Sequence, residues 1–260
     1  MRGAIETLLA RIGRHELQIL LTVLVVAALL LGFAELAGDV LEGEATAFDR
    51  SLLLLLRNPA DVSDPIGPGW LENAARDITA LGSTVNLTLL VLAVVGYLAL
   101  TAKRAAAVMV LVSVGGGMIL STLLKMGFSR PRPDLVPHGD VVYTASFPSG
   151  HAMLSAVAFL TLGALMARVQ PRRRVKAYIL LSAVLLTVLV GCSRVYLGVH
   201  WPTDVLAGWC VGAAWSAICW LAALWLQRRG VVEKEGTGNG GEGDTGGQCG
   251  QGGGDRVPSA

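Results

Sequence analysis

Apolar residues along this chain gather into six long runs, and short polar segments separate them. The runs cover residues 17–36, 83–100, 105–124, 151–166, 177–191 and 205–226. A helix needs about 20 apolar residues to cross the hydrocarbon core of a bilayer. The fourth and fifth runs are short, but flanking arginine and lysine side chains can reach the interface and allow a further turn at each end. The pattern therefore predicts an all-α polytopic membrane protein with six transmembrane helices in a bundle.

Two shorter features of this pattern need separate interpretation. The stretch 51–56 is apolar but too short to span a bilayer, which favours an interfacial helix. The first run follows three arginines, as in a secretory signal peptide, but it exceeds the usual apolar length of about 7–15 residues. Glu35 also disrupts the small-residue cleavage pattern before Gly38. We therefore favour a retained anchor over a cleaved signal peptide.

The composition agrees with a membrane protein and excludes some other classes. Hydrophobic residues make up 53% of the 260 residues and charged residues 15%, so the chain departs from the soluble average in both respects. The net charge of +2 is too small to indicate a nucleic-acid partner. None of the four cysteines forms a C-x-x-C pair, which favours small membrane hydrophobes over a disulfide framework or a metal site. They are Cys192, Cys210, Cys219 and Cys249.

The distribution of lysine and arginine between the apolar runs predicts the orientation. One side of the membrane would carry twelve of these cations and the other side seven, with Lys234 and Arg256 in the distal tail completing the 21. The richer side is expected to be cytoplasmic. Both termini would then be cytoplasmic, in a multi-pass protein of the cell membrane. The cluster of Arg172, Arg173, Arg174 and Lys176 is interpreted mainly as part of this topology signal.

The chain divides into three parts on this reading. Residues 1–16 form a cytoplasmic N-terminus, and residues 17–229 form one six-helix domain. Residues 230–260 are rich in glycine and of low complexity, so they cannot bury a core. We expect this tail to be disordered, cytoplasmic and without chemistry.

Ionisable groups near the membrane gather in three segments. The first runs from Lys125 to Arg132-Pro133, the second is Pro148-Ser149-Gly150-His151, and the third runs from Ser193-Arg194 through His200 to Asp204. The first two flank a single loop, and the chain crosses the membrane twice between the second and the third. All three segments therefore face one compartment, which the charge count assigns to the outer side.

The residue types in these segments indicate an anion site. Lys125, Arg132 and Arg194 have no equal set of acids nearby, and such cations bind phosphate as a point charge or a planar fork. Ser149 is a good N-cap for a helix, and Gly150 lets the backbone approach a ligand closely. The free N–H groups at a helix start favour phosphate.

Two histidines and an aspartate complete the set. His200 and Asp204 are four residues apart, with Pro202 suited to the first position of a helix. A carboxylate beside a histidine fixes its tautomer and stabilises its cationic form. Taken singly, each segment also has a structural explanation: a helix cap, anchors for lipid headgroups, or a cap pair. The remaining polar residues nearby, Arg130, Asp134, His138 and Asp140, are interpreted as ordinary loop residues.

Two further groups receive no catalytic role. His15 lies on the cytoplasmic side, away from the three segments. Five tryptophans fall in or beside the last run, and those near its ends suit the interfacial belts of a membrane protein. They are Trp201, Trp209, Trp215, Trp220 and Trp225.

Together the three segments resemble the type 2 phosphatidic acid phosphatase superfamily of membrane phosphatases. That family is marked by K-x6-R-P, P-S-G-H and S-R-x5-H-x3-D in this order, and every spacing is met here. The resemblance covers about residues 77–226. It includes the stretch Asp77-Ile-Thr-Ala-Leu-Gly-Ser83, which resembles one found in bacterial members.

The resemblance implies a role for each residue. His200 would attack phosphorus and form a phosphohistidine, and Asp204 would orient it. His151 would protonate the leaving oxygen and then activate water. The phosphate oxygens would be held by Lys125, Arg132, Ser149, the Gly150 backbone and Arg194. No metal and no other cofactor would be needed, since three cations take the place of a metal.

The substrate is left open by these motifs. A lipid phosphate or diphosphate is expected, with undecaprenyl diphosphate, phosphatidate and phosphatidylglycerol phosphate as candidates, beside the surrounding membrane lipids as partners. One alternative is hydrolysis of a soluble phosphate ester, and another is a membrane lipid-binding or transport protein without hydrolysis. Against transport, the charges lie at one face of the membrane, and no paired broken helices are evident. The sequence does not determine the oligomeric state.

Overall fold

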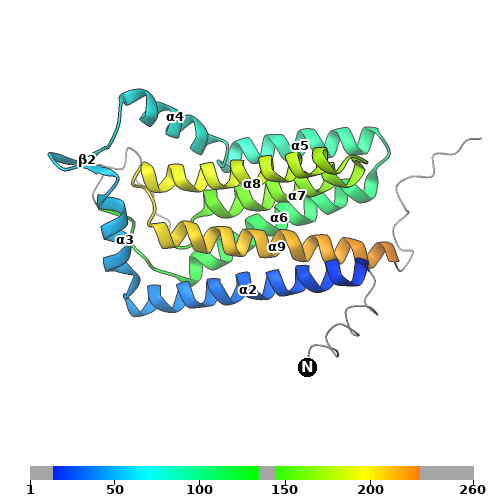
Figure 1. Ribbon diagram of the computed structural model, residues 1–260, viewed down its shortest axis with the longest axis horizontal. Helices are drawn as coiled ribbons and strands as arrows, with labels where there is room; N and C mark the ends of the chain where they lie inside the picture. The colour runs from blue at the N-terminus through cyan, green and yellow to red at the C-terminus, as the bar shows by residue number, and fades with distance from the viewer. Residues whose placement is uncertain (1–13, 135–144, 229–260) are drawn as a thin grey trace, which may run out of the picture.

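The computed structural model describes residues 14–134 and 145–228. Apart from the connecting loops, the chain over these residues forms helices and one short hairpin (Figure 1). The helices are α2 (Arg14–Glu42), α3 (Ala45–Leu54), α4 (Gly69–Ala80), α5 (Thr84–Leu100), α6 (Arg104–Gly127), α7 (Gly150–Val169), α8 (Arg173–Tyr196) and α9 (Pro202–Arg228). The antiparallel hairpin pairs β1 (Arg57–Asn58) with β2 (Asp61–Pro65). The expectations for residues 1–13 and for the glycine-rich tail lie outside the described residues.

The all-helical membrane fold is confirmed, but the six predicted spans need one qualification. Five helices, α2, α6, α7, α8 and α9, are long and apolar enough to cross a bilayer. The remaining predicted span corresponds to α5, which has 17 residues. At 1.5 Å per residue it covers about 25 Å, less than the hydrocarbon core. It reaches a full span only together with α4, from which it is bent by 49°.

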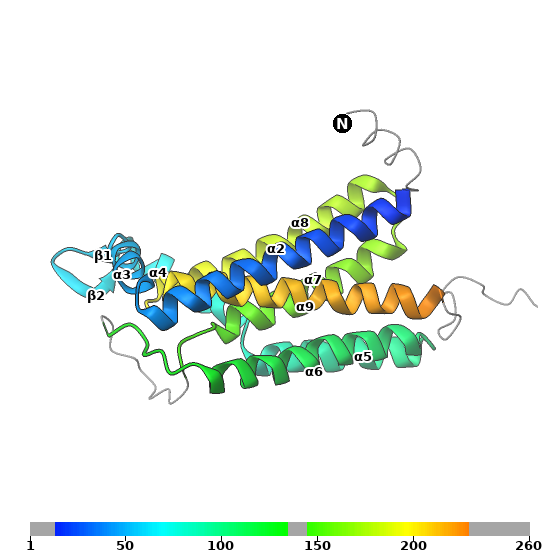
Figure 2. The same ribbon diagram turned by 90° about the horizontal axis from the view of Figure 1, so that it is seen from below.

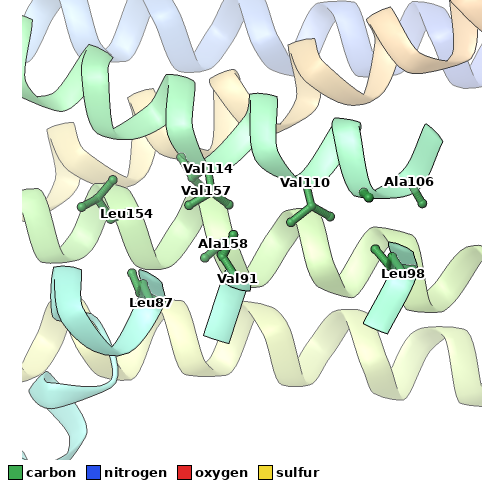
Figure 3. Packing of buried hydrophobic residues seen from close by; sticks show 10 residues of the cluster. Leu87, Val91, Leu98, Ala106, Val110, Val114, Leu154, Val157 and Ala158 are labelled. Carbon is green, nitrogen blue, oxygen red and sulfur yellow. The ribbon is translucent and has the colours of Figure 1, made fainter. Parts of the chain in front are cut away.

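Helix α7 lies at the centre of the bundle and contacts α5, α6, α8 and α9. In the most apolar stretch of α7, 56% of the residues are buried inside the bundle, whereas in that of α2 the share is 0%. Apolar side chains of α5, α6 and α7 interlock in a cluster that includes Leu87, Val91, Val110, Val114 and Val157 (Figure 3). Lipid tails are as apolar as these side chains, so the hydrophobic effect does not drive the helices together. Close packing of the buried side chains therefore determines how the helices meet.

Two glycines allow α9 to lie directly against the start of α7. A Cβ atom on Gly208 would lie 2.7 Å from the carbonyl oxygen of Ser149, and one on Gly212 would lie 2.5 Å from that of Met153. Small residues permit such close backbone contact between membrane helices. The backbone N–H of Ser149 also donates to the carbonyl oxygen of Asp204 at 2.9 Å. This packing brings the second and third chemical segments of the sequence together.

Several connecting elements gather at the end of the bundle where α7 and α9 begin. Helix α3, the hairpin and α4 all lie there, at the left of Figure 1. The end of α6 lies at the same side (Figure 2). The apolar stretch 51–56 is helical as far as Leu54, where α3 ends.

Arg57 attaches the hairpin to the end of α8. Its side chain is buried, and its guanidinium donates to the carbonyl oxygens of Val195 and Tyr196. The hydroxyl of Tyr196 in turn donates to the carbonyl oxygen of Ile66 at 2.7 Å. A cation at the last carbonyls of a helix complements its dipole, although burial lowers the pKa of Arg57. The connection from α3 to α4 is therefore held against the bundle.

Candidate active site

Residues from all three chemical segments line one cavity of about 330 Å³. Six of the eight predicted site residues are among its walls: Lys125, Arg132, Gly150, His151, Arg194 and His200. Side chains of α5, α6 and α7 complete it: Thr84, Met118, Ser121, Thr122 and Leu154. Among the described residues that line it there is no acid. The cavity therefore combines two imidazoles with three cations, which is an environment for an anion.

His200 is fixed by Asp204 on the side of the ring that faces away from the cavity. Its Nδ1 lies 3.3 Å from Oδ2 of Asp204, and both side chains are fully buried. Its Nε2 lies 3.3 Å from Nη1 of Arg132, which lines the cavity. When Nδ1 carries the proton toward the carboxylate, the lone pair of Nε2 faces the cavity side, where it accepts a hydrogen bond from Nη1 of Arg132. The arrangement therefore directs the unprotonated ring nitrogen toward the cavity.

Burial also keeps this imidazole neutral. It lowers the pKa of His200 to about 4; Arg194 and Arg132 act in the same direction, and Asp204 opposes them. The ring is therefore uncharged at neutral pH. A neutral imidazole is the form that can attack phosphorus.

The turn between α8 and α9 explains how His200 and Asp204 meet. Gly198 ends α8 with a φ of 70°, a left-handed conformation that favours glycine. Helix α9 begins at Pro202, which confirms the predicted first helical position. Oδ2 of Asp204 accepts from the backbone N–H of Trp201 at 3.0 Å, as an acidic residue does in a capping box. Asp204 therefore caps the helix and contacts the histidine with the same oxygen.

The three cations are held by different elements. Nη1 of Arg194 donates to Oγ1 of Thr79 on α4 at 3.2 Å. A Cβ atom added to Gly150 would lie 3.4 Å from Nζ of Lys125, so the ammonium group lies over the first turn of α7. Nη1 of Arg132 donates to the carbonyl oxygen of Val199 at 3.0 Å, and burial lowers the pKa of this arginine. The cost of collecting these charges is offset when an anion enters.

Ser149 lies behind the cavity wall. It is fully buried, and its Oγ accepts from the backbone N–H of Ala152 at 3.5 Å. The predicted N-cap is therefore confirmed. It fixes the start of α7, and with it Gly150 and His151.

Arg130 is not an ordinary loop residue, so that interpretation was wrong. Its side chain is only 8% exposed, and Nη1 donates to Oδ1 of Asp204 at 2.7 Å. Nη2 pairs with Oδ2 of Asp49 on α3, a residue that the sequence analysis did not identify. Ser146 was also missed, and its Oγ donates to Oδ2 of Asp204. Asp134 is exposed as expected, while His138 and Asp140 lie outside the described residues.

Comparison with known proteins supports what the site indicates. A model of the PAP2 superfamily matches residues 106–228. Phosphatidylglycerophosphatase B of Bacillus subtilis is 34% identical over 146 residues, which is 55% of this chain and 70% of that protein. The chain belongs to the PAP2 superfamily. It is a metal-independent phosphatase of this type and a multi-pass membrane protein.

Two further proteins are similar to this chain, one by its solved structure and one by its sequence. The crystal structure of a transmembrane PAP2 type phosphatidylglycerolphosphate phosphatase from Bacillus subtilis aligns with a TM-score of 0.66 and 28% identity. The alignment covers 78% of this chain and 98% of the Bacillus subtilis chain. An undecaprenyl-diphosphatase of Sulfolobus acidocaldarius is 37% identical over 82 residues, or 32% of each protein. The names of these PAP2 relatives thus refer to different lipids, so membership of the superfamily does not by itself identify the lipid.

The stretch that resembles bacterial PAP2 members, residues 77–83, supports the site directly. Thr79 accepts the hydrogen bond from Arg194. Gly82 lies at the bend between α4 and α5, where an added Cβ atom would come within 2.4 Å of Val190 Cγ1 and 3.5 Å of His151 Cβ. A side chain at this position would therefore displace α8 or His151.

Of the tryptophans near the ends of the last run, Trp225 is 51% exposed, whereas Trp201 differs from the expected interfacial belt. Trp201 is 7% exposed, and its Nε1 donates to the carbonyl oxygen of Pro131 at 3.0 Å. Its ring lies 5.7 Å from the guanidinium carbon of Arg130, in cation–π contact. Trp209 and Trp215 pack between helices and donate to carbonyl oxygens of α8 and α6. Burial of the indole N–H with a partner explains why they lie inside the bundle.

None of the described cysteines lines the cavity or forms a disulfide. Cys192, Cys210 and Cys219 are free thiols, and Cys249 lies outside the described residues. Within residues 14–134 and 145–228, no three His, Cys, Asp or Glu side chains form a group that could hold a metal ion.

Proposed function

We propose that this PAP2 phosphatase removes the terminal phosphate of a membrane lipid through a phosphohistidine on His200. One observation carries the proposal: Nε2 of His200 lies on the side of the ring toward an acid-free cavity that three cations and His151 also line. In the first step Nε2 attacks phosphorus, and the bond from phosphorus to the lipid oxygen breaks. His151 donates a proton to that leaving oxygen.

In the second step water attacks the phosphorus of the phosphohistidine. His151 takes a proton from this water, the P–N bond breaks, and inorganic phosphate leaves. Asp204 stabilises the positive charge that develops on the His200 ring. Lys125, Arg132 and Arg194 stabilise the charge on the phosphoryl oxygens, with help from the helix start at Ser149 and Gly150.

The walls of the cavity favour a lipid over a soluble ester. Beside the cations, the apolar side chains of Met118 and Leu154 line it. Thr84 on α5 and Thr122 on α6 also line it, and both are exposed. A lipid whose headgroup binds at the cations can therefore extend its chain past Thr84 and Thr122 into the bilayer.

The candidate lipids are undecaprenyl diphosphate, phosphatidate and phosphatidylglycerol phosphate. The names of the relatives include both a phospholipid phosphatase and a polyprenyl diphosphatase. We place the site at the outer face of the membrane and both termini in the cytoplasm, because the cation-rich connections lie on the opposite side. An outward site favours a polyprenyl diphosphate, or a broad range of lipid phosphates.

Phosphate release from a panel of lipid and soluble phosphate esters tests the proposal. The purified protein in detergent is compared with His200→Ala and with His15→Ala, a matched control at the far end of α2. We expect release from lipid phosphates, loss in His200→Ala and full activity in His15→Ala. A fully active His200→Ala variant would eliminate the nucleophile. Exclusive turnover of soluble esters would refute the lipid substrate, and lipid binding without release would indicate a binding protein.

A further inference from the structure

A buried network of charges extends from the catalytic histidine to α3. Arg130 lies between two carboxylates, those of Asp204 and Asp49, and both acids are 0% exposed. Asp204 contacts His200, whereas Asp49 contacts neither His200 nor the cavity in any described interaction. The network therefore contains one acid with an evident role and a second acid without one.

The guanidinium of Arg130 is shared in an unusual way. Arginine commonly presents its two Nη groups to both oxygens of one carboxylate. Here Nη1 binds Oδ1 of Asp204, and Nη2 binds Oδ2 of Asp49. The fork is thus split between two acids, and Oδ2 of Asp204 remains available for His200.

We propose that Asp49 is a positioning residue that, through Arg130, keeps one oxygen of Asp204 directed at His200. This inference rests on the proposed nucleophile. Without Asp49, the second Nη group of Arg130 has no acid to bind, and bidentate pairing with Asp204 becomes its best alternative. The guanidinium then competes with Nδ1 of His200 for Oδ2. The ring loses the partner that fixes its tautomer and stabilises its charge.

A second contact locks the same geometry from the side of α9. Oδ1 of Asp49 accepts from the backbone N–H of Thr203 at 2.9 Å, and Oδ2 accepts from the Thr203 hydroxyl. This N–H belongs to the first turn of α9, where backbone donors lack helical partners. Asp49 therefore holds the turn that carries Asp204 as well as the cation beside it.

The position of Asp49 in the chain gives the inference its significance. Asp49 lies on α3, well before residues 106–228 that match the PAP2 superfamily model. The three motif segments form the cavity, but the orientation of their central carboxylate depends on an acid from outside them. The N-terminal part of the chain is thus part of the catalytic apparatus and more than an anchor.

The test measures single-turnover phosphorylation of the enzyme with a labelled lipid phosphate, in the full-length protein. The variant is Asp49→Asn, and Asp39→Asn is the control, since Asp39 is an exposed acid near the end of α2. We expect the rate constant of phosphoenzyme formation to fall roughly ten- to a hundredfold, by analogy with the loss of a residue that orients a metal-binding histidine. The amplitude should stay unchanged, because the folded fraction is preserved.

A double variant separates positioning from a merely structural role. Asp49→Asn combined with Arg130→Gln removes the competing cation together with the acid that restrains it. We expect this double variant to phosphorylate faster than Asp49→Asn and at about the rate of Arg130→Gln, because Asp49 acts through Arg130. Additive losses would overturn the proposal, as would an Asp49→Asn rate equal to that of Asp39→Asn. If one single variant fails to fold, comparison of the double variant with the other single variant still decides the question.

The outcomes also separate this proposal from the function on which it rests. An inactive wild-type protein, or an active His200→Ala variant, contradicts the proposed function. An active wild type and an inactive His200→Ala, together with an unaffected Asp49→Asn, contradict only the positioning role. A lower amplitude at an unchanged rate constant in Asp49→Asn would show a folding role and would also contradict positioning.

Discussion

Replacing Asp204 by asparagine should remove most of the catalytic power while leaving the three cations of the cavity in place. The carboxylate accepts from Arg130 with Oδ1, and from Trp201, Ser146 and His200 with Oδ2. An asparagine has a single side-chain oxygen, so it can accept hydrogen bonds either from Arg130 or from the three donors on the other side. Its NH₂ group must therefore face either the Arg130 guanidinium or the three donors around His200.

The size of the effect follows from the less costly orientation. With NH₂ toward Arg130, the side chain loses one charged hydrogen bond, worth about 1.5–3 kcal/mol. The carboxylate charge that stabilises the developing imidazolium is also lost, which we take as about 2–3 kcal/mol more, from the value of one charged contact. Together these give about 3.5–6 kcal/mol, or roughly a four-hundredfold to twenty-five-thousandfold loss in kcat. The same exchange in a serine protease triad costs about 10⁴.

The assay is release of inorganic phosphate in detergent, with Asp134→Asn as a matched control. Asp134 is exposed and lies 4.0 Å from Arg50, so its variant should behave as wild type. The folded state of Asp204→Asn is checked by size-exclusion chromatography and by its thermal midpoint. A folded variant that retains more than about a tenth of the wild-type kcat would contradict the energies above.

Three further predictions follow from the same structure. Because the pKa of His200 is lowered to about 4, the protonated, non-nucleophilic ring forms only in acid, so kcat/KM should fall below about pH 5; a loss of half the value near pH 6.5 would refute this. EDTA should leave phosphate release unchanged, and strict dependence on magnesium would count against the mechanism. Gly212→Ala places a Cβ atom 2.5 Å from the Met153 carbonyl oxygen and should cost about 1–3 kcal/mol of stability, measured as a lower thermal midpoint. The control is Gly115→Ala, which meets nothing within 4 Å; equal midpoints would show that α7 and α9 are not closely packed.

The parts of the site that depend on local sequence were predictable. Ser149 as an N-cap and Pro202 as the first residue of α9 follow from the chemistry of helix starts, and both are confirmed. The convergence of the three segments on one cavity follows from counting membrane crossings between them. These inferences need only the order of residues and the direction of each span.

The parts that depend on distant partners were not predictable. Arg130 has the sequence context of a loop, and only the packing of α3 against α9 shows that its partners are Asp49 and Asp204. Asp49 lies 154 residues from Thr203, and no spacing rule links them. The bend between α4 and α5 was likewise missed, because an apolar run defines length but not direction.

The central claim is that His200 carries the phosphoryl group during turnover. Enzyme quenched during steady-state hydrolysis of a lipid phosphate, then digested under alkaline conditions, can be mapped by mass spectrometry. The account predicts phosphohistidine on the peptide that contains His200, and its absence from the Asp204→Asn variant at the same time point. Phosphate found on His151 instead, or no covalent intermediate while product accumulates, would contradict it.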